Sequence, residues 1–151
     1  EDSGRAFGED SKKTLDYERM LAFAYAEQGD FHSALPFIEH AYNSLLSTLG
    51  ASDPATLESK YNLAFTLLRL NDSDRAIPLW VEALNDPHMN TDQLTNIQLN
   101  LAAAYLTQNN FVDALKTFRK ARKTCLQDPV AYAEKLNYAD QQISNLRSFI
   151  Q

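Results

Sequence analysis

The 151-residue sequence has little cysteine, glycine or proline. Its single cysteine, Cys125, has no partner for an internal disulfide and is too few for a multi-cysteine zinc site. This usage suits a reducing compartment, so we expect a cytoplasmic protein. Only 4 glycines and 5 prolines are present, which argues against a turn-rich β-sandwich or a disordered chain and favours long helices.

Basic residues are not in excess, and long apolar runs are missing. The chain has 14 Lys and Arg against 20 Asp and Glu, the opposite of what phosphate contacts require, so we expect no nucleic-acid partner. No apolar run approaches the roughly 18 residues of a membrane span, so we expect no membrane insertion. Because the first residue is Glu1 rather than Met, we expect the chain to be part of a longer protein.

An internal repeat is the most informative feature that the sequence does have. A Leu-Ala pair and two later alanines recur with a step of 42 and then of 38 residues. The matched residues are Leu21, Leu63 and Leu101; Ala22, Ala64 and Ala102; Ala34, Ala76 and Ala114; and Ala41, Ala83 and Ala121. A fixed period of this size is typical of stacked helical repeats. A partial fourth copy is expected from about Pro129.

Each copy is predicted to form two amphipathic helices joined by a turn, because apolar residues recur at three- and four-residue steps. The turns are placed at Gly29-Asp30, Asn71-Asp72 and Asn109-Asn110, whose residue types tolerate left-handed backbone and cap a following helix.

Proline marks further boundaries. Asp53-Pro54 and Asp128-Pro129 each place a capping Asp before a Pro, which predicts the start of a helix. Pro36 and Pro78 lie a few residues past a turn, where we expect their missing N–H groups to be tolerated.

These residues resemble the tetratricopeptide repeat, over roughly residues 8–128. In that family, small residues at the positions of Ala22, Ala34 and Ala41 let neighbouring helices pack closely. The 42-residue step and the Gly-x-x-x-Pro-x-Thr linker at residues 50–56 are most similar to the kinesin-light-chain-like subtype. The third repeat departs from the subtype, because its linker at residues 85–90 lacks the Gly and the Thr.

The resemblance implies an all-α fold, a right-handed α-solenoid of three helical hairpins plus a C-terminal capping helix, with seven helices in all. The expected organisation is a flexible N-terminal tail at 1–10 and a single domain at 11–150. Its repeats are expected at about 15–48, 57–90 and 95–128, with the capping helix at about 130–150.

Stacked hairpins of this family line a concave groove with their first helices, which implies a peptide-binding surface. The candidate peptide-binding residues are Asn62, Asn100, Asn137, Phe23, Tyr61, Phe65, Arg69 and Leu99. Three of them, the asparagines, occupy one equivalent position, and a carboxamide offers both a donor and an acceptor to an extended ligand backbone. Each residue also has an alternative to ligand binding. An Asn can satisfy backbone groups at a helix junction, Phe23 and Phe65 can pack in the core, and Arg69 can be solvated.

Charge is uneven along the chain, and basic residues gather near its C-terminal end. Lys116, Arg119, Lys120 and Lys123 fall on one stripe of a predicted helix, with Arg122 beside them. The stripe is either a solvated helix face or a contact surface for an acidic partner.

No arrangement of residues predicts catalysis, a metal site or a cofactor. His32, His40 and His88 do not combine with Cys125 or a carboxylate in a metal-binding spacing, and the four glycines form no phosphate loop. We therefore expect a protein that is not an enzyme and has no catalytic residues, bound metal or cofactor.

The predicted function is a non-catalytic protein–protein interaction module, an adaptor that binds a peptide segment of a partner protein in the groove. Two alternatives stay open. The chain is a structural subunit that docks through its convex face or terminal helix into a larger complex or a homodimer. Or it is the signalling-peptide sensor domain of a regulator, which requires an effector domain that this chain does not contain.

Overall fold

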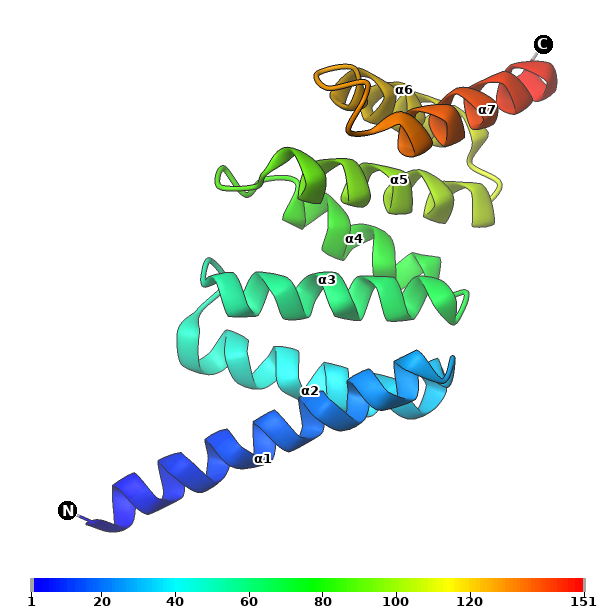
Figure 1. Cartoon of the computed structure of the whole chain (residues 1–151). Helices are drawn as coiled ribbons and strands as arrows, with labels where there is room; N and C mark the ends of the chain where they lie inside the picture. Colours follow the sequence, from blue (N-terminus) through cyan, green and yellow to red (C-terminus); the bar gives the residue numbers. More distant parts are fainter. Residues whose placement is uncertain (1, 151) are drawn as a thin grey trace. The chain divides into compact units, whose positions relative to one another are not determined.

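The computed structural model describes residues 2–150, with side chains from Lys12 to Ile150. Residues 2–150 form seven α-helices and no strand (Figure 1). The helices are α1 (Asp2–Glu27), α2 (Phe31–Leu49), α3 (Pro54–Arg69), α4 (Ser73–Ala83), α5 (Thr91–Thr107), α6 (Phe111–Cys125) and α7 (Ala133–Ile150). The prediction of an all-α fold with seven helices is confirmed.

The helices group into two compact units, the first ending at Leu70 and the second beginning at Asn71. The boundary falls inside the range 57–90 that the sequence assigns to the second repeat, so its two helices belong to different units. Each unit is described by itself, and the right-handed superhelix of the whole chain stays a prediction.

The first unit consists of α1, α2 and α3, with α2 packed against both of the others (Figure 1). Its buried face on α2 consists of Ala34, Ala41 and Leu45, at steps of seven and four residues, as an amphipathic helix requires. Hydrogen bonding adds to this packing, because the Thr56 hydroxyl of α3 donates to the Leu45 carbonyl of α2 at 3.3 Å. The small side chains of α2 allow its neighbours to approach closely.

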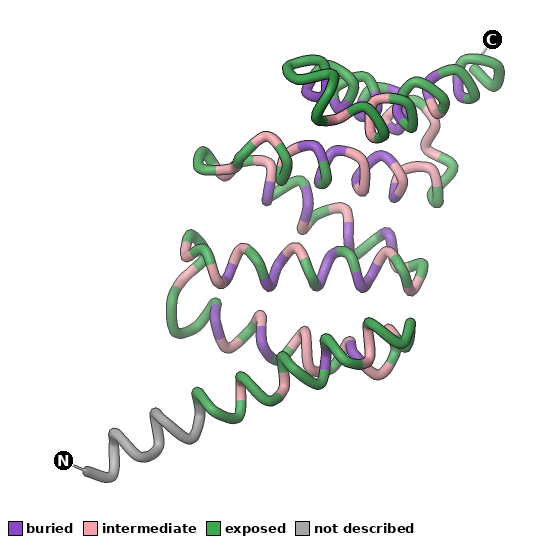
Figure 2. Tube along the Cα trace, viewed as in Figure 1, coloured by how far each residue is buried: buried purple, intermediate pink, exposed green. Residues whose placement is uncertain are grey.

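The described part of α1 is mostly exposed, in contrast to α2 (Figure 2). Ala22 is its single buried side chain among residues 12–27. The helix begins at Asp2, within the segment predicted to be a flexible tail, but the side chains of residues 1–11 lie outside the described part. The tail at 1–10 therefore stays a prediction, as do the domain and repeat limits.

The second unit consists of α4 to α7, in which each helix packs against its neighbour in sequence. A cluster of buried residues joins α5, α6 and α7. Its members are Ala102, Ala114, Leu115, Phe118, Ile143 and Leu146. At the edge of this cluster the rings of Phe118 and Tyr138 meet edge to face, with centroids 5.9 Å apart, and Arg122 of α6 forms a 2.6 Å ion pair with Asp140 of α7.

The three predicted turns are confirmed by their backbone angles. Gly29, Asn71 and Asn109 have φ values of 77°, 61° and 57°, the left-handed region that Gly and Asn tolerate best. The next residue in each case caps the following helix: the side chains of Asp30, Asp72 and Asn110 accept hydrogen bonds from backbone N–H groups three residues on.

One of the two predicted Asp-Pro helix starts is correct. Asp53 caps α3 by accepting from the Ala55 N–H at 2.9 Å, and Pro54 is the first helical residue. Asp128 instead accepts from the Ala131 N–H at 3.1 Å within a turn, and α7 begins at Ala133. An Asp-Pro pair starts a turn as readily as a helix, which is why the local signal placed this boundary too early.

Pro36 and Pro78 lie deeper in their helices than the sequence argument assumed. Each is the sixth residue of its helix, α2 and α4 respectively, and both helices continue past it. The missing N–H at that depth would have had an intrahelical acceptor, so each proline removes one hydrogen bond.

Candidate functional site: a groove in the first unit

An open groove with a volume of about 1010 Å³ runs along the three helices of the first unit. Its wall on α1 consists of Asp16, Arg19, Met20, Ala22, Phe23, Ala24, Ala26 and Glu27; its floor on α2 of Phe31, Phe37, Ile38 and Ala41; and its wall on α3 of Glu58, Ser59, Asn62, Phe65 and Thr66. We call this surface the α1–α3 groove. Its volume lies at the upper end of the range for small-molecule sites and suits a ligand with several side chains.

Large apolar side chains line the groove while remaining open to solvent. Phe23 and Met20 on α1 are each 67% exposed, and Phe65 on α3 is 41% exposed. Exposed apolar groups that gather in one hollow, rather than being scattered singly, mark interaction surfaces. Covering them with a ligand would remove that apolar area from water, which is favourable by roughly 25 cal/mol per Å².

Phe65 packs against an aromatic residue of α2. Its ring meets Phe31, the first residue of α2, edge to face with the centroids 6.2 Å apart. The Arg69 guanidinium lies over the Phe31 ring, 5.1 Å from its centroid. Since Arg69 is engaged in this cation–π contact and lies outside the groove lining, it supports the wall of the groove rather than lining it.

Asn62 lies on α3, one helical turn before Phe65. It is exposed, and its carboxamide makes no hydrogen bond to another described residue. Its backbone carbonyl accepts from the Thr66 hydroxyl at 2.8 Å, so Thr66 is already satisfied locally. The Asn62 side chain is thus free to donate to and accept from a ligand backbone.

The charged groups of the groove lining are mainly acidic. Asp16, Glu27 and Glu58 contribute three carboxylates against the single guanidinium of Arg19. All four side chains are exposed, and none forms an ion pair with another described residue. The groove therefore combines an apolar centre with a rim of net negative charge.

Comparison with known proteins gives the family. A family model described as tetratricopeptide repeat matches residues 5–85, more than half of the chain. The chain belongs to the tetratricopeptide repeat family. No curated protein matches the sequence. Tetratricopeptide repeats generally mediate protein–protein interactions and are typically non-catalytic.

The structure brings three of the eight residues predicted from the tetratricopeptide resemblance into the α1–α3 groove: Phe23, Asn62 and Phe65. The alternative of core packing does not describe Phe23, given its exposure. Tyr61 is half-buried and lies outside the groove lining.

The remaining three predicted residues lie in the second unit. Asn100 on α5 is half-buried and Asn137 on α7 is exposed, whereas Leu99 packs against the buried cluster of α5, α6 and α7. Contact of these residues with a ligand, and a ladder of asparagines that includes Asn62, stay predictions.

The residues that form the floor of the groove were not predicted from the sequence. The tetratricopeptide resemblance assigns ligand contacts to the first helix of each repeat, but Phe37 and Ile38 on α2 also line the groove. A signal was present, since two adjacent large apolar residues on α2 cannot both point into a single narrow core face. Both side chains are half-buried.

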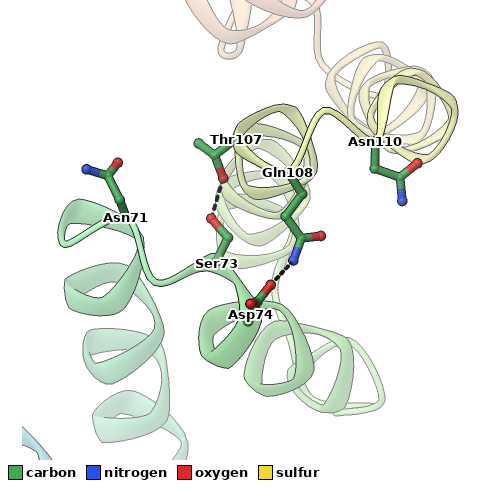
Figure 3. A pocket seen from close by; sticks show the side chains of 6 residues that line it. All are labelled: Asn71, Ser73, Asp74, Thr107, Gln108 and Asn110. Carbon is green, nitrogen blue, oxygen red and sulfur yellow. Dashed lines mark hydrogen bonds between the residues drawn. The ribbon is translucent and has the colours of Figure 1, made fainter.

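A second hollow, in the second unit, is polar and open, and hydrogen bonds join its lining residues (Figure 3). It is lined by Asn71, Ser73, Asp74, Thr107, Gln108 and Asn110. Thr107 donates its hydroxyl proton to the Ala104 carbonyl at 2.7 Å, so Ser73 donates to Thr107. Gln108 donates to Asp74 at 2.5 Å. These bonds fasten the start of α4 to the end of α5, which gives the hollow a structural role.

The basic stripe predicted on α6 is exposed to solvent. Lys116, Arg119, Lys120 and Lys123 form no ion pair with another described residue, whereas Arg122 is engaged with Asp140. Both interpretations of the stripe, as a solvated face or as a contact for an acidic partner, remain.

Groups capable of other chemistry are few within residues 12–150. Cys125 is fully buried, and burial raises the pKa of its thiol. No group of three or more His, Cys, Asp or Glu side chains in this range is placed to hold a metal ion. In the described part of the chain, every helix is either too short or too polar to cross a bilayer.

Proposed function

We propose that this tetratricopeptide chain is an adaptor that binds an apolar peptide segment of a partner protein in the α1–α3 groove. The observation that carries the proposal is the exposure of Phe23, Met20 and Phe65 along one groove of about 1010 Å³. Asn62 supplies the polar contact, because its free carboxamide can bond the ligand backbone whatever the ligand sequence.

The length of the groove fits a short segment. Asp16 and Glu27 mark its ends on α1, and eleven residues of helix rise about 16 Å. An extended chain advances about 3.3 Å per residue, so the groove accommodates about five extended residues. A segment of that size with two apolar anchors gains about 3–6 kcal/mol, at roughly 1.5–3 kcal/mol per buried side chain, which corresponds to a weak affinity between tens of micromolar and a few millimolar.

We further propose that the chain belongs to the kinesin-light-chain-like subtype and acts as a cytoplasmic recruiting module. The 42-residue step and the linker with Gly50, Asp53 and Pro54 support the subtype. In the structure, Gly50 has φ 85° and ends α2, while Asp53 and Pro54 start α3.

The test is a selection from a random 12-residue peptide library displayed on phage, performed on the wild-type chain and in parallel on Phe23→Ser. Phe23 is largely exposed, so the variant folds, and circular dichroism checks this. Clones enriched on the wild type but not on Phe23→Ser support the groove. Equal enrichment on both proteins, or none on the wild type, would remove the proposal.

A second candidate function is docking as a structural subunit or homodimer through the terminal helix. It is favoured by Phe149 on α7, which is 74% exposed and stacks on Phe111 of α6 with centroids 5.9 Å apart. Sedimentation equilibrium on the wild type and on Phe149→Ser tests the homodimer: a dimer that Phe149→Ser abolishes supports it, and a wild-type monomer contradicts it. The sensor alternative has no such observation in its favour.

A further inference from the structure

We infer that the α1–α3 groove selects its ligand by charge, taking apolar segments flanked by Lys or Arg and rejecting those flanked by Asp or Glu. The inference rests on the proposed function and adds the chemical class of the partner. It follows from the charges that border the apolar centre of the groove.

The acidic groups are placed at equivalent positions of successive repeats. Asp16 on α1 and Glu58 on α3 are 42 residues apart, the same step that relates Phe23 to Phe65 and Ala22 to Ala64. Since α1 and α3 run in the same direction on either side of α2 (Figure 1), Asp16 and Glu58 border the same end of the groove. A cation of the ligand at this end meets carboxylates from both walls.

The other end of the groove has no such pair. There the equivalent positions are Glu27 on α1 and Arg69 on α3, of opposite charge. Arg69 lies over the Phe31 ring and outside the groove lining, so Glu27 is the charged group that a ligand meets. Both ends of the groove therefore present carboxylates to a ligand, which predicts that basic residues flank the apolar anchors.

One basic group of the lining offsets part of this negative charge. Arg19 lines the groove one turn from Asp16 and forms no ion pair with Asp16 or with another described residue. The lining thus keeps three carboxylates and one guanidinium, a net charge of −2. Complementary charge contributes to specificity and to the rate of association, and like charge opposes binding of acidic segments.

The clones that depend on Phe23 in the phage selection provide the probe. We expect Lys and Arg to outnumber Asp and Glu in these clones by about threefold or more. The best clone is then synthesised with its basic residues intact, or replaced by Gln, or replaced by Glu.

Affinities of the three peptides are compared on the wild type and on Asp16→Asn combined with Glu58→Gln. The basic peptide should bind the variant about tenfold more weakly than the wild type, and the Gln peptide should bind both equally, because each exposed pair contributes a few-fold. Of the three peptides, only the basic one should bind the wild type more weakly when the salt concentration is raised. Glu134→Gln, an exposed carboxylate of α7, is the matched control and should change nothing.

The outcomes separate the two claims. If groove-dependent clones show no excess of basic residues, or if the Glu peptide binds the wild type as tightly as the basic one, charge selection is wrong while the groove stands. If no clone depends on Phe23, the proposed function fails and charge selection fails with it.

Discussion

The rings of Phe31 and Phe65 meet edge to face with centroids 6.2 Å apart, joining the first residue of α2 to the wall of the α1–α3 groove on α3. The Arg69 guanidinium lies 5.1 Å from the centroid of Phe31. The Phe31 ring thus contacts both the aromatic side chain that faces a ligand and the guanidinium of Arg69. This arrangement makes Phe31 a positioning residue for the site.

The contact between Arg69 and Phe31 should be measurable as a coupling energy. We expect a double-mutant cycle with Arg69→Met and Phe31→Leu to give about 0.5–1 kcal/mol, the usual size of a cation–π contact near the surface. Both substitutions keep most of the side-chain volume. Urea unfolding of the four proteins measures the coupling, and a value indistinguishable from zero would show that the two side chains are merely adjacent.

The left-handed backbone at Asn109, with φ 57°, predicts opposite effects of two small substitutions. Asn109→Ala should lower the free energy of unfolding by about 1 kcal/mol, because alanine keeps the Cβ that disfavours this conformation but lacks the side-chain amide that lets asparagine tolerate it. Asn109→Gly should be neutral or slightly stabilising. The comparison is made by thermal or urea unfolding. Equal destabilisation by both substitutions would mean that the asparagine side chain, not the backbone angle, matters at this turn.

The buried thiol of Cys125 should make the free energy of unfolding fall at alkaline pH. Burial raises the pKa of its thiol above the ordinary value of 9.0, so the folded state holds the proton more tightly than the unfolded state. The contribution of the protonated Cys125 thiol to the free energy of unfolding is therefore complete below about pH 9 and is lost as the pH rises above it. The difference in unfolding free energy between wild type and Cys125→Ala, followed from pH 7 to 10, should shrink. A constant difference would contradict the assignment.

The same burial predicts a protected thiol. Cys125 should react with a thiol reagent at pH 7 far more slowly in the folded chain than in urea, because it is fully buried at the end of α6. Equal rates in both states, followed by absorbance, would mean that the end of α6 opens readily.

Features determined by neighbouring residues were predictable from the sequence. The turns at Gly29, Asn71 and Asn109 and the cap at Asp53 depend on backbone preferences and on hydrogen bonds within three residues, so residue type was sufficient. The signal at Asp128 failed for the same reason, because a local preference does not distinguish a turn from the start of a helix.

Features determined by packing were only partly predictable. The repeat placed Phe23, Asn62 and Phe65 at related positions, and the structure places all three in one groove. The contribution of Phe37 on α2 and the packing of Leu99 against the buried cluster depend on how three helices meet, which no local pattern specifies. The depth of Pro36 in α2, by contrast, follows from the cap at Asp30 and could have been counted from the predicted turn.

The most direct test of the account is a titration, by calorimetry, of one selected peptide into Phe23→Ala and Tyr17→Ala. Both side chains are on α1 and are 67% exposed, but only Phe23 lines the α1–α3 groove. We predict that Phe23→Ala weakens binding by about tenfold or more, through loss of roughly 1.5 kcal/mol of apolar burial, and that Tyr17→Ala binds like the wild type. Equal affinity of the two variants for the peptide would contradict the assignment of the groove as the binding site.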